Sequence, residues 1–316
     1  MTKRYSEDEL IVKLFLPIAG PEAYGLADDA ALMAVRDKPL VITTDMLVAG
    51  VHFFAQDPPE LIAKKALRVN LSDLAAKGAV PQGFLLSIAL PMDWSNAWLE
   101  AFARGLGEDA QEFAAPLLGG DTSSTSGPLT ISITAFGTVE TFIARCGARV
   151  GDGVYVSGPI GEAALGLWLR QNPNHLDTLS HKAREDLLAR YRLPWPRLDL
   201  GPLLISSASA SMDISDGLVG DLTKLTQASG VSAEVMTSDI PLSVAALEAI
   251  ALNPELLELA LTGGDDYEIL FTAGADFSPP EGIRRIGAVT AGSDPPILRD
   301  GEGKKVFFKK NSYRHF

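Results

Sequence analysis

The chain has little cysteine and histidine, and this scarcity narrows its possible chemistry. It contains 316 residues, of which one is cysteine (Cys146) and 4 are histidine. A single cysteine cannot form an internal disulfide, and its presence fits a reducing compartment. No cysteine–histidine pair has the spacing of a zinc site. We therefore expect a cytoplasmic protein without structural zinc.

Long apolar runs and an excess of basic residues are also missing. The longest apolar stretches, such as residues 83–90, have the size of a strand and not of a membrane-spanning helix. Residues 1–9 are too polar for a signal peptide. The formal net charge is −13, whereas nucleic-acid phosphates are bound by basic surfaces. Neither a membrane nor a nucleic acid is expected as a partner.

The common nucleotide-binding and hydrolase motifs are absent. The chain has no Gly-x-x-x-x-Gly-Lys-Ser/Thr loop, no Gly-x-Gly-x-x-Gly opening a helix after a strand, and no Gly-x-Ser-x-Gly elbow. Gly158-Pro159-Ile160-Gly161 is only a weak candidate for an anion site at a helix N-terminus. An acidic protein can still bind a nucleotide through divalent cations held by its carboxylates. Any nucleotide would therefore depend on aspartate-bound metals for most of the positive charge.

The pattern of apolar residues predicts a two-domain protein of the α+β (mixed α/β) class. The length favours two domains, and the Gly-rich polar interval 145–153 suggests a boundary between 1–148 and 149–316. Helices and strands mix in both halves without strict βαβ regularity. We expect helices at 7–16, 60–78, 97–118, 161–170, 182–191, 216–229 and 243–251, and strands at 40–42, 83–90, 129–137, 154–156, 207–212, 232–236 and 266–272.

The stretch 39–54 is the first candidate for a functional site. The β-branched run 40–42 reads as a buried strand that stops at Thr43, Thr44 and Asp45. A strand that ends in oxygen ligands can hold a metal at the edge of a sheet. The alternative is an ordinary turn, in which such residues are common. His52 follows seven residues after Asp45.

Similar acidic clusters recur along the chain, which favours the metal interpretation. Oxygen ligands without cysteine suit Mg²⁺ or Mn²⁺ better than zinc. Taken singly, Asp213 and Ser215 could cap a helix, and Asp121 could form an Asx turn. On the predicted helix 60–78, Asn70 and Asp73 share one face. The other clusters are Asp28-Asp29, Gly119-Gly120-Asp121-Thr122, Asp213-Ile214-Ser215-Asp216-Gly217 and Gly263-Gly264-Asp265-Asp266-Tyr267-Glu268.

Five segments, in order, resemble signature segments of the thiamine-monophosphate kinase family. The resemblance is collinear and extends to Phe316. The enclosing superfamily also includes aminoimidazole-ribonucleotide synthetase and selenophosphate synthetase. The segments are Thr43-Thr44-Asp45-Met46-Leu47-Val48-Ala49-Gly50-Val51-His52-Phe53, Asn70-Leu71-Ser72-Asp73-Leu74-Ala75-Ala76, Gly119-Gly120-Asp121-Thr122, Asp213-Ile214-Ser215-Asp216-Gly217-Leu218 and Gly264-Asp265-Asp266-Tyr267-Glu268.

This resemblance implies a fold, a reaction and a set of site residues. The fold is an N-terminal α/β domain that pairs its sheet with a second subunit, giving a homodimer, and a C-terminal α+β domain that completes the nucleotide and substrate site. The reaction is direct phosphoryl transfer from ATP to thiamine monophosphate, assisted by several Mg²⁺ ions and without an evident catalytic base. The implied metal ligands are Asp29, Thr43, Thr44, Asp45, Asp73, Asp121, Asp213 and Asp216; Gly120, Asp121, Arg145 and Ser215 contact ATP; His52, Asp265 and Tyr313 contact thiamine monophosphate.

The sequence departs from the family pattern at two places. Ala27 stands where the family commonly has glycine before the Asp pair, so the metal role is carried over to Asp29 and not to Asp28. Arg314 replaces the usual acidic neighbour of Tyr313. Two other interpretations stay open: an ATP-dependent ligase or cyclase of the same superfamily with another phosphorylated substrate, and a non-catalytic acidic protein that binds divalent cations.

Overall fold

The computed structural model describes residues 5–26, 30–33, 38–175, 177–309 and 312–313. The chain divides into two compact units, which we call the N-terminal unit (Met1–Leu74 and Ala79–Glu140) and the C-terminal unit (Ala75–Gly78 and Thr141–Phe316). Helix α2 (Pro59–Ala76) therefore ends inside the C-terminal unit. Among the described residues, no helix has the length and apolar character needed to span a membrane.

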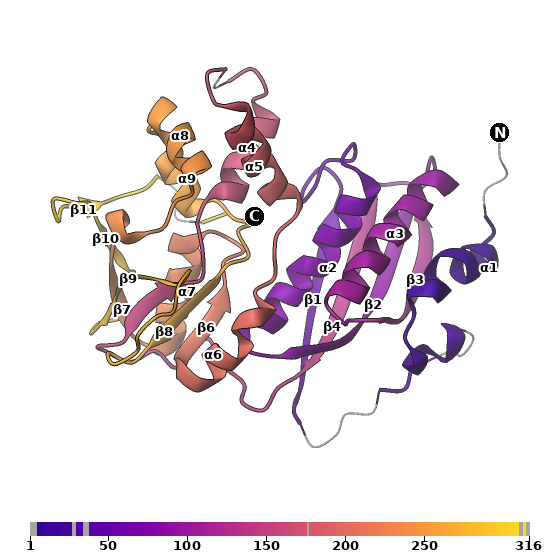
Figure 1. Cartoon of the computed structure of the whole chain (residues 1–316), viewed down its shortest axis with the longest axis horizontal. Coiled ribbons are helices and arrows are strands. Elements are labelled where there is room, and N and C mark those ends of the chain that lie inside the picture. Colours follow the sequence, from indigo (N-terminus) through magenta and orange to yellow (C-terminus); the bar gives the residue numbers. More distant parts are fainter. Residues whose placement is uncertain (1–4, 27–29, 34–37, 176, 310–311, 314–316) are drawn as a thin grey trace. The chain divides into compact units, whose positions relative to one another are not determined.

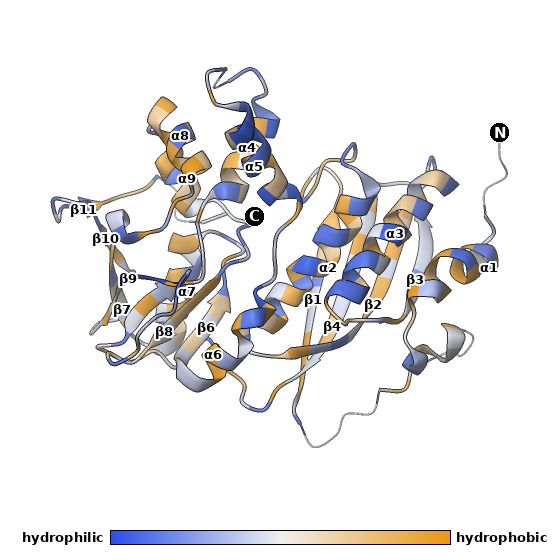
Figure 2. Cartoon of the chain, viewed as in Figure 1, coloured by the Kyte–Doolittle hydropathy of each residue, from blue (hydrophilic) through white to orange (hydrophobic). Residues whose placement is uncertain are grey.

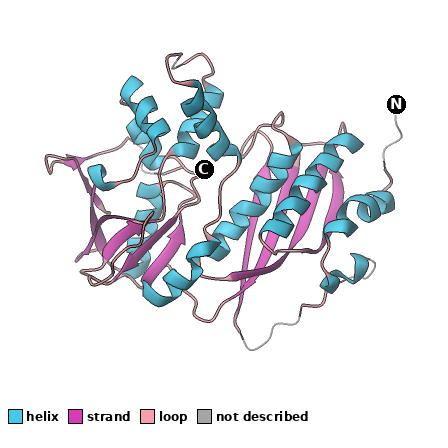
Figure 3. Cartoon of the chain, viewed as in Figure 1, coloured by secondary structure: helices cyan, strands magenta, loops and turns pink. Residues whose placement is uncertain are grey.

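The N-terminal unit is a four-stranded sheet with helices on one face. The strand order is β1-β4-β2-β3, and only the pair β2 and β3 is parallel. Helices α2 and α3 lie across the sheet (Figures 1 and 3). Ser95 caps α3 by accepting a hydrogen bond from the Trp98 N–H. The elements are β1 (Leu40–Val48), β2 (Val80–Pro91), α3 (Asn96–Glu112), β3 (Leu117–Thr125) and β4 (Thr130–Thr138), preceded by α1 (Glu7–Leu10), η1 (Ile11–Phe15), η2 (Leu16–Ile18) and η3 (Pro21–Leu26).

Residues on the strands alternate between a helix-covered face and an open face. On β4, Ile131, Ile133 and Ala135 are fully buried beneath the helices, because successive side chains of a strand point to opposite faces. On β1, Ile42 and Met46 belong to the other set, and each is 58% exposed. We call this second side of the sheet the open face.

The C-terminal unit is built around a seven-stranded sheet of order β11-β10-β7-β9-β5-β8-β6. Its neighbouring strands are antiparallel except for the parallel pair β10 and β7. The strands are β5 (Gly153–Val156), β6 (Ala208–Asp213), β7 (Ser232–Met236), β8 (Ile269–Ala273), β9 (Arg284–Thr290), β10 (Ile297–Arg299) and β11 (Lys305–Val306).

Apolar side chains cover both faces of this larger sheet. Helix α7 contributes Leu218, Leu222 and Leu225 to one core, and α6 contributes Leu204 to another. A further apolar cluster joins α4, α5, α8 and α9. Among these helices, α5 is mostly hydrophilic and α8 is mostly hydrophobic (Figure 2). The helices are α4 (Glu162–Gln171), α5 (His181–Arg192), η4 (Leu198–Leu200), α6 (Gly201–Ser207), α7 (Leu218–Ser229), η5 (Thr237–Asp239), α8 (Val244–Leu252) and α9 (Leu256–Thr262).

The α+β class predicted from the sequence is confirmed, but several element boundaries were wrong. The strand expected at 266–272 begins at Ile269, so residues 266–268 lie in a loop. The strand expected to stop at Ile42 continues to Val48, because all nine residues of β1 pair with β4. The helix expected at 97–118 ends at Glu112, and 117–125 form strand β3. Gly119-Gly120-Asp121-Thr122 therefore lies in a strand and not in a turn, since parallel pairing with β2 supplies its backbone hydrogen bonds.

Candidate functional site

Two predicted metal ligands of the N-terminal unit meet on the helix-covered face. The Thr43 hydroxyl donates a hydrogen bond to the Asp73 carboxylate across the gap between β1 and α2. One turn earlier on α2, the Asn70 side-chain oxygen accepts a hydrogen bond from the Asp45 N–H at 2.9 Å. The expectation that Asn70 and Asp73 share a helix face is confirmed. This contact holds β1 and α2 in register at the residues singled out by the sequence.

Other predicted ligands of the same sheet point to the open face. Thr44 follows Thr43, and its hydroxyl accepts a hydrogen bond from the Thr134 hydroxyl at 3.1 Å. Asp121 on β3 pairs with Ser87 on β2. Ser87 pairs with Ser132 on β4, and Ser132 pairs with Met46 on β1. Asp121 and Met46, the neighbour of Asp45, are therefore separated by three strand spacings. Three strand spacings amount to about 14 Å. Asp45 and Asp121 of one sheet therefore do not ligate the same ion.

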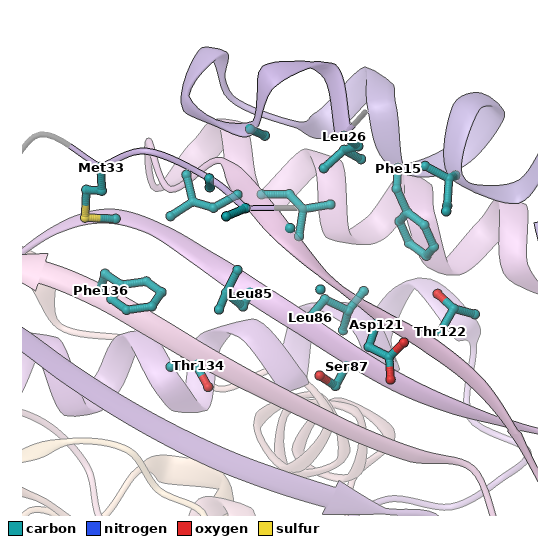
Figure 4. Close-up of a pocket in the computed structure, with 18 of the residues that line it drawn as sticks. Phe15, Leu26, Met33, Leu85, Leu86, Ser87, Asp121, Thr122, Thr134 and Phe136 are labelled. Atoms are coloured by element: carbon teal, nitrogen blue, oxygen red, sulfur yellow. The ribbon is translucent and has the colours of Figure 1, made fainter. Parts of the chain in front are cut away.

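A pocket of about 800 Å³ lies between the open face and the segment that precedes β1, which contributes lining residues between Ile11 and Met33. Its walls are mainly apolar, with Phe15 and Leu26 on one side and Leu85 and Phe136 on the other (Figure 4). At one end the Asp121 carboxylate lies near the hydroxyls of Ser87 and Thr122, and the Thr134 hydroxyl lies below Leu85 and Phe136 (Figure 4). A flat apolar ligand with a charged, metal-binding tail would match this distribution.

Gly120 has a structural reason to be glycine. A Cβ at this position would lie 1.8 Å from the Leu86 carbonyl oxygen of the neighbouring strand. The close approach of β3 to β2 therefore requires glycine immediately before Asp121.

The loop after β1 fixes the imidazole of His52. The Val48 N–H donates a hydrogen bond to His52 Nδ1 at 3.0 Å, and the His52 carbonyl accepts one from the buried Lys65 ammonium at 3.1 Å. Because Nδ1 is an acceptor, the neutral ring carries its proton on Nε2. These contacts hold His52 in place at the end of β1.

In the C-terminal unit, the predicted nucleotide loop and the predicted substrate loop are joined by their backbones. We call residues 213–217 the nucleotide loop and residues 263–268 the substrate loop. The Asp265 N–H donates to the Ser215 carbonyl at 2.9 Å, and the Tyr267 N–H donates to the Ile214 carbonyl at 2.8 Å. A Cβ on Gly264 would lie 2.1 Å from the Ser215 carbonyl oxygen. The two loops therefore behave as one structural piece.

The substrate loop has a strained backbone. Asp265 and Tyr267 have positive φ angles of 73° and 53°, which are uncommon for residues other than glycine. The Tyr267 hydroxyl donates to Asp265 Oδ1 at 3.3 Å. Strain of this kind is often found at ligand sites, where the surrounding structure maintains it.

Asp266 occupies the helix N-terminus that the sequence marked as a weak anion site. Its carboxylate accepts hydrogen bonds from the Gly161 N–H at 2.8 Å and the Ala163 N–H at 3.4 Å. The group that caps the start of α4 is therefore a side chain of the protein itself. Burial raises the pKa of Asp266 well above its usual value, and the negative charges of Glu268 and Glu162 act in the same direction.

Asp213, Arg145 and Tyr313 also belong to the C-terminal unit. Asp213 ends β6 and is buried, whereas Arg145 is exposed. The Tyr313 N–H donates to the Asp216 carbonyl at 3.1 Å, so the end of the chain contacts the nucleotide loop. Asp28, Asp29 and Arg314 lie outside the described residues.

Among the described residues, no three histidine, cysteine, aspartate or glutamate side chains gather around a common point. Mg²⁺ does not need such a cage, because it is usually bound by one or two carboxylates together with substrate phosphates and water. The carboxylates and hydroxyls present are the oxygen donors that this ion prefers. The residues therefore fit metal ions that arrive with a phosphorylated ligand.

Sequence reasoning missed the charged contacts that support the two loops. Asp221 and Lys224 on α7 contact the nucleotide loop, and Glu268 binds Arg197 through an ion pair at 2.8 Å. One sequence feature could have revealed Asp221: it is a carboxylate between Leu218 and Leu222 on the apolar face of a predicted helix, which indicates a buried charge.

Comparison with known proteins places the chain in a family. Residues 27–139 match the family model "AIR synthase related protein, N-terminal domain", and residues 149–278 match the corresponding C-terminal domain. A thiamine-monophosphate kinase of Caulobacter vibrioides is 41% identical over 317 residues, covering 96% of this chain and 87% of that protein. The chain belongs to the thiamine-monophosphate kinase family. A second member, from Aquifex aeolicus, is 36% identical and covers 93% of this chain and 94% of its own.

Solved structures of the same family share the fold. AaThiL complexed with AMPPCP and TMP has a TM-score of 0.81 and 35% identity, covering 92% of this chain and 91% of its own. The thiamine-monophosphate kinase of Stenotrophomonas maltophilia K279a has a TM-score of 0.79 and 38% identity, covering 89% and 91%. The family expected from the sequence motifs is therefore confirmed.

Proposed function

We propose that this protein phosphorylates thiamine monophosphate to thiamine diphosphate, with ATP as the phosphoryl donor. The observation that carries this proposal is the similarity, over 92% of the chain, to AaThiL complexed with AMPPCP and TMP. Those ligands correspond to the donor and acceptor of the proposed reaction. The reaction joins two phosphates, so the attacking oxygen is already ionised at neutral pH and no general base is required.

The pocket on the open face is our candidate for the adenine and phosphate site of ATP. Its apolar walls, including Phe136 and Leu85, suit a nucleobase, and Asp121 with Gly120 lies at its polar end. In the C-terminal unit, Ser215 and the Arg145 guanidinium are the proposed phosphate contacts. A guanidinium provides a fixed charge and a planar set of donors that match phosphate oxygens.

Several Mg²⁺ ions are proposed to accompany ATP. Bound Mg²⁺ would neutralise phosphate charge, which dominates catalysis of phosphoryl transfer. The protein orients its acidic side chains for this purpose; the Thr43 hydroxyl, for example, donates a hydrogen bond to the Asp73 carboxylate. The residues proposed to hold the ions are Asp29, Thr43, Thr44, Asp45, Asp73, Asp121, Asp213 and Asp216.

Three residues are proposed to recognise thiamine monophosphate. The His52 Nε2–H is a donor for a phosphate oxygen, while the Asp265 carboxylate suits the cationic thiazolium. Tyr313 offers an aromatic face for the cation or the aminopyrimidine, and its side chain is 47% exposed.

The proposed activity is tested by product formation with purified protein. Thiamine diphosphate and ADP should form together only when ATP, Mg²⁺ and thiamine monophosphate are all present. Release of ADP with another phosphorylated acceptor, but not with thiamine monophosphate, would instead favour a ligase or cyclase of the superfamily. Mg²⁺-dependent melting without any nucleotide effect or turnover would favour a cation-binding protein.

We propose that the protein acts in the cytoplasm, where ATP is available. We also propose that it forms a homodimer in which the open faces of two subunits meet. The exposed Ile42 and Met46 side chains would become buried between two sheets. Light scattering should give twice the chain mass, and the double variant Ile42→Lys/Met46→Lys should give a monomer. Val244→Lys, at a residue that is 83% exposed in the C-terminal unit, is the matched control and should leave the dimer intact.

A further inference from the structure

A fully buried carboxylate on α7 supports the backbone of the nucleotide loop. Asp221 has 0% exposure, and its Oδ2 accepts hydrogen bonds from the Ser215 N–H at 3.0 Å and the Asp216 N–H at 2.9 Å. Both donors belong to residues with proposed roles at the phosphates or the metal. Asp221 itself points into the protein and away from solvent, so it is not a ligand.

Lys224 completes this arrangement one turn later on α7. Its ammonium contacts Asp221 Oδ1 at 2.7 Å and Asp216 Oδ2 at 2.5 Å. Its side chain is 37% exposed, whereas that of Asp221 is not exposed at all. The same lysine thus compensates the buried charge and orients the carboxylate of Asp216.

The contacts of Asp221 fix the part of the loop that must meet a charged ligand. A buried carboxylate is costly unless its oxygens are hydrogen-bonded and its charge is paired. Here these requirements are met by the two loop N–H groups and Lys224. Movement of Ser215 or Asp216 would leave a buried charge with fewer partners, so the loop is held in one conformation before any ligand arrives.

We propose that Asp221 is a positioning residue for MgATP: it acts through the backbone of Ser215 and Asp216, and Lys224 assists by orienting the Asp216 side chain. This inference rests on the proposed function for the identity of the nucleotide. It assigns Asp221 no contact with ATP, metal or thiamine monophosphate.

The test compares Asp221→Asn with Asp109→Asn. Asp109 is a matched control because it is also buried (2% exposed) and is paired with a cation, Arg68, at 2.6 Å. It lies on α3, which carries none of the proposed ligand residues. In Asp221→Asn the side chain keeps its size, but its amide cannot accept from both loop N–H groups and Lys224 together.

Three measurements are made on each variant: the melting temperature, the KM for ATP at saturating Mg²⁺, and the calorimetric Kd for AMPPCP with Mg²⁺. Both variants should melt at a lower temperature. Asp221→Asn should raise KM and Kd by about tenfold, equivalent to one lost charged hydrogen bond of about 1.4 kcal/mol. Asp109→Asn should leave both within twofold of the wild type.

Two results would overturn the inference. One is a folded Asp221→Asn protein whose KM and Kd stay within twofold of the wild type; the other is an equal rise in both variants, which would indicate general loosening. A wild-type protein that binds AMPPCP but makes no thiamine diphosphate would instead contradict the proposed function. Because Kd is measured without turnover, the two failures are distinguishable.

Discussion

The two units hold their proposed ligand residues by different means. In the N-terminal unit, Thr43, Asp45 and Asp121 lie on paired strands, whose backbone hydrogen bonds fix their direction. In the C-terminal unit, the nucleotide and substrate loops lie mostly outside the strands; a few backbone hydrogen bonds join the two loops, and buried charges give them further support. A strand positions a ligand residue through its own ladder, whereas a loop requires additional side chains that do not themselves touch the ligand.

The largest effect is expected where a strand-borne ligand residue is neutralised. Asp45→Asn keeps the size of the side chain and its N–H contact with Asn70, but removes the negative charge proposed to bind Mg²⁺. Turnover should fall by about 10²–10³-fold at saturating Mg²⁺, because metal charge stabilises the transition state by several kcal/mol. Thiamine diphosphate formation measures the effect.

The control for Asp45→Asn is an exposed carboxylate of the same unit. Glu140 pairs with Lys38 at 3.1 Å, with 72% of its side chain exposed, and Glu140→Gln should leave turnover within twofold. Near-normal turnover of Asp45→Asn would refute the metal role of this strand residue.

A smaller effect is expected when a charge supporting a loop is removed. Glu268 is 3% exposed and is bound by Arg197 at 2.8 Å and Arg190 at 3.4 Å. Glu268→Gln should destabilise the fold by about 1–3 kcal/mol, because Arg197 and Arg190 lose one charged partner but keep Asp199 and Glu162. It should also raise the KM for thiamine monophosphate, since Glu268 ends the substrate loop. Urea unfolding and steady-state kinetics measure the two effects.

The matching change in the N-terminal unit is Arg68→Met, which breaks the buried pair with Asp109. Arg68→Met should destabilise the fold to a similar degree, but it should not change the KM for ATP or the KM for thiamine monophosphate. If Glu268→Gln lowered the stability but left the KM for thiamine monophosphate unchanged, the contrast between the units would not extend to the substrate loop.

The smallest expected effect is a change in the pH dependence of stability. Burial raises the pKa of Asp266 above its value in the unfolded chain, so the folded state binds its proton more tightly. The stability due to this group is therefore complete below about pH 3.9 and is lost as pH rises through the folded pKa. Asp266→Asn removes this dependence.

Urea unfolding of the wild type and Asp266→Asn at a series of pH values tests the prediction. The variant should gain stability relative to the wild type as pH rises, by at most about 1.4 kcal/mol per pH unit between the two pKa values. A constant difference across the series would show that Asp266 binds its proton no more tightly in the folded state than in the unfolded chain.

The sequence was most informative where apolar residues follow a clear period. On β4, alternation of Leu129 and the isoleucines predicted the strand to within one residue at each end. Strand β3 was missed, because after Leu117 and Leu118 it contains only glycine, aspartate, serine and threonine. Its conformation depends on pairing with β2, a tertiary contact that overrides weak strand propensity.

The sequence supplied candidate site residues, whose roles stay predictions, but not their arrangement. One helix face was placed correctly through Asn70 and Asp73. The turn expected at Thr43 was wrong because β1 continues, which sends Thr43 and Thr44 to opposite faces. Contacts such as Glu268 with Arg197 join residues 71 positions apart, so local patterns do not reveal them.

Helix α2 has a consequence for dissecting the protein. Its last residues, Ala75 and Ala76, belong to the same apolar cluster as Tyr155 and Leu204, and the following Lys77 donates to the Ser211 carbonyl at 2.7 Å. A gene fragment that begins at residue 141 would encode a C-terminal unit without this short insertion from the other half of the chain. Such a fragment would expose apolar surface and aggregate during expression, so the two halves are better studied by co-expression or circular permutation than by simple truncation.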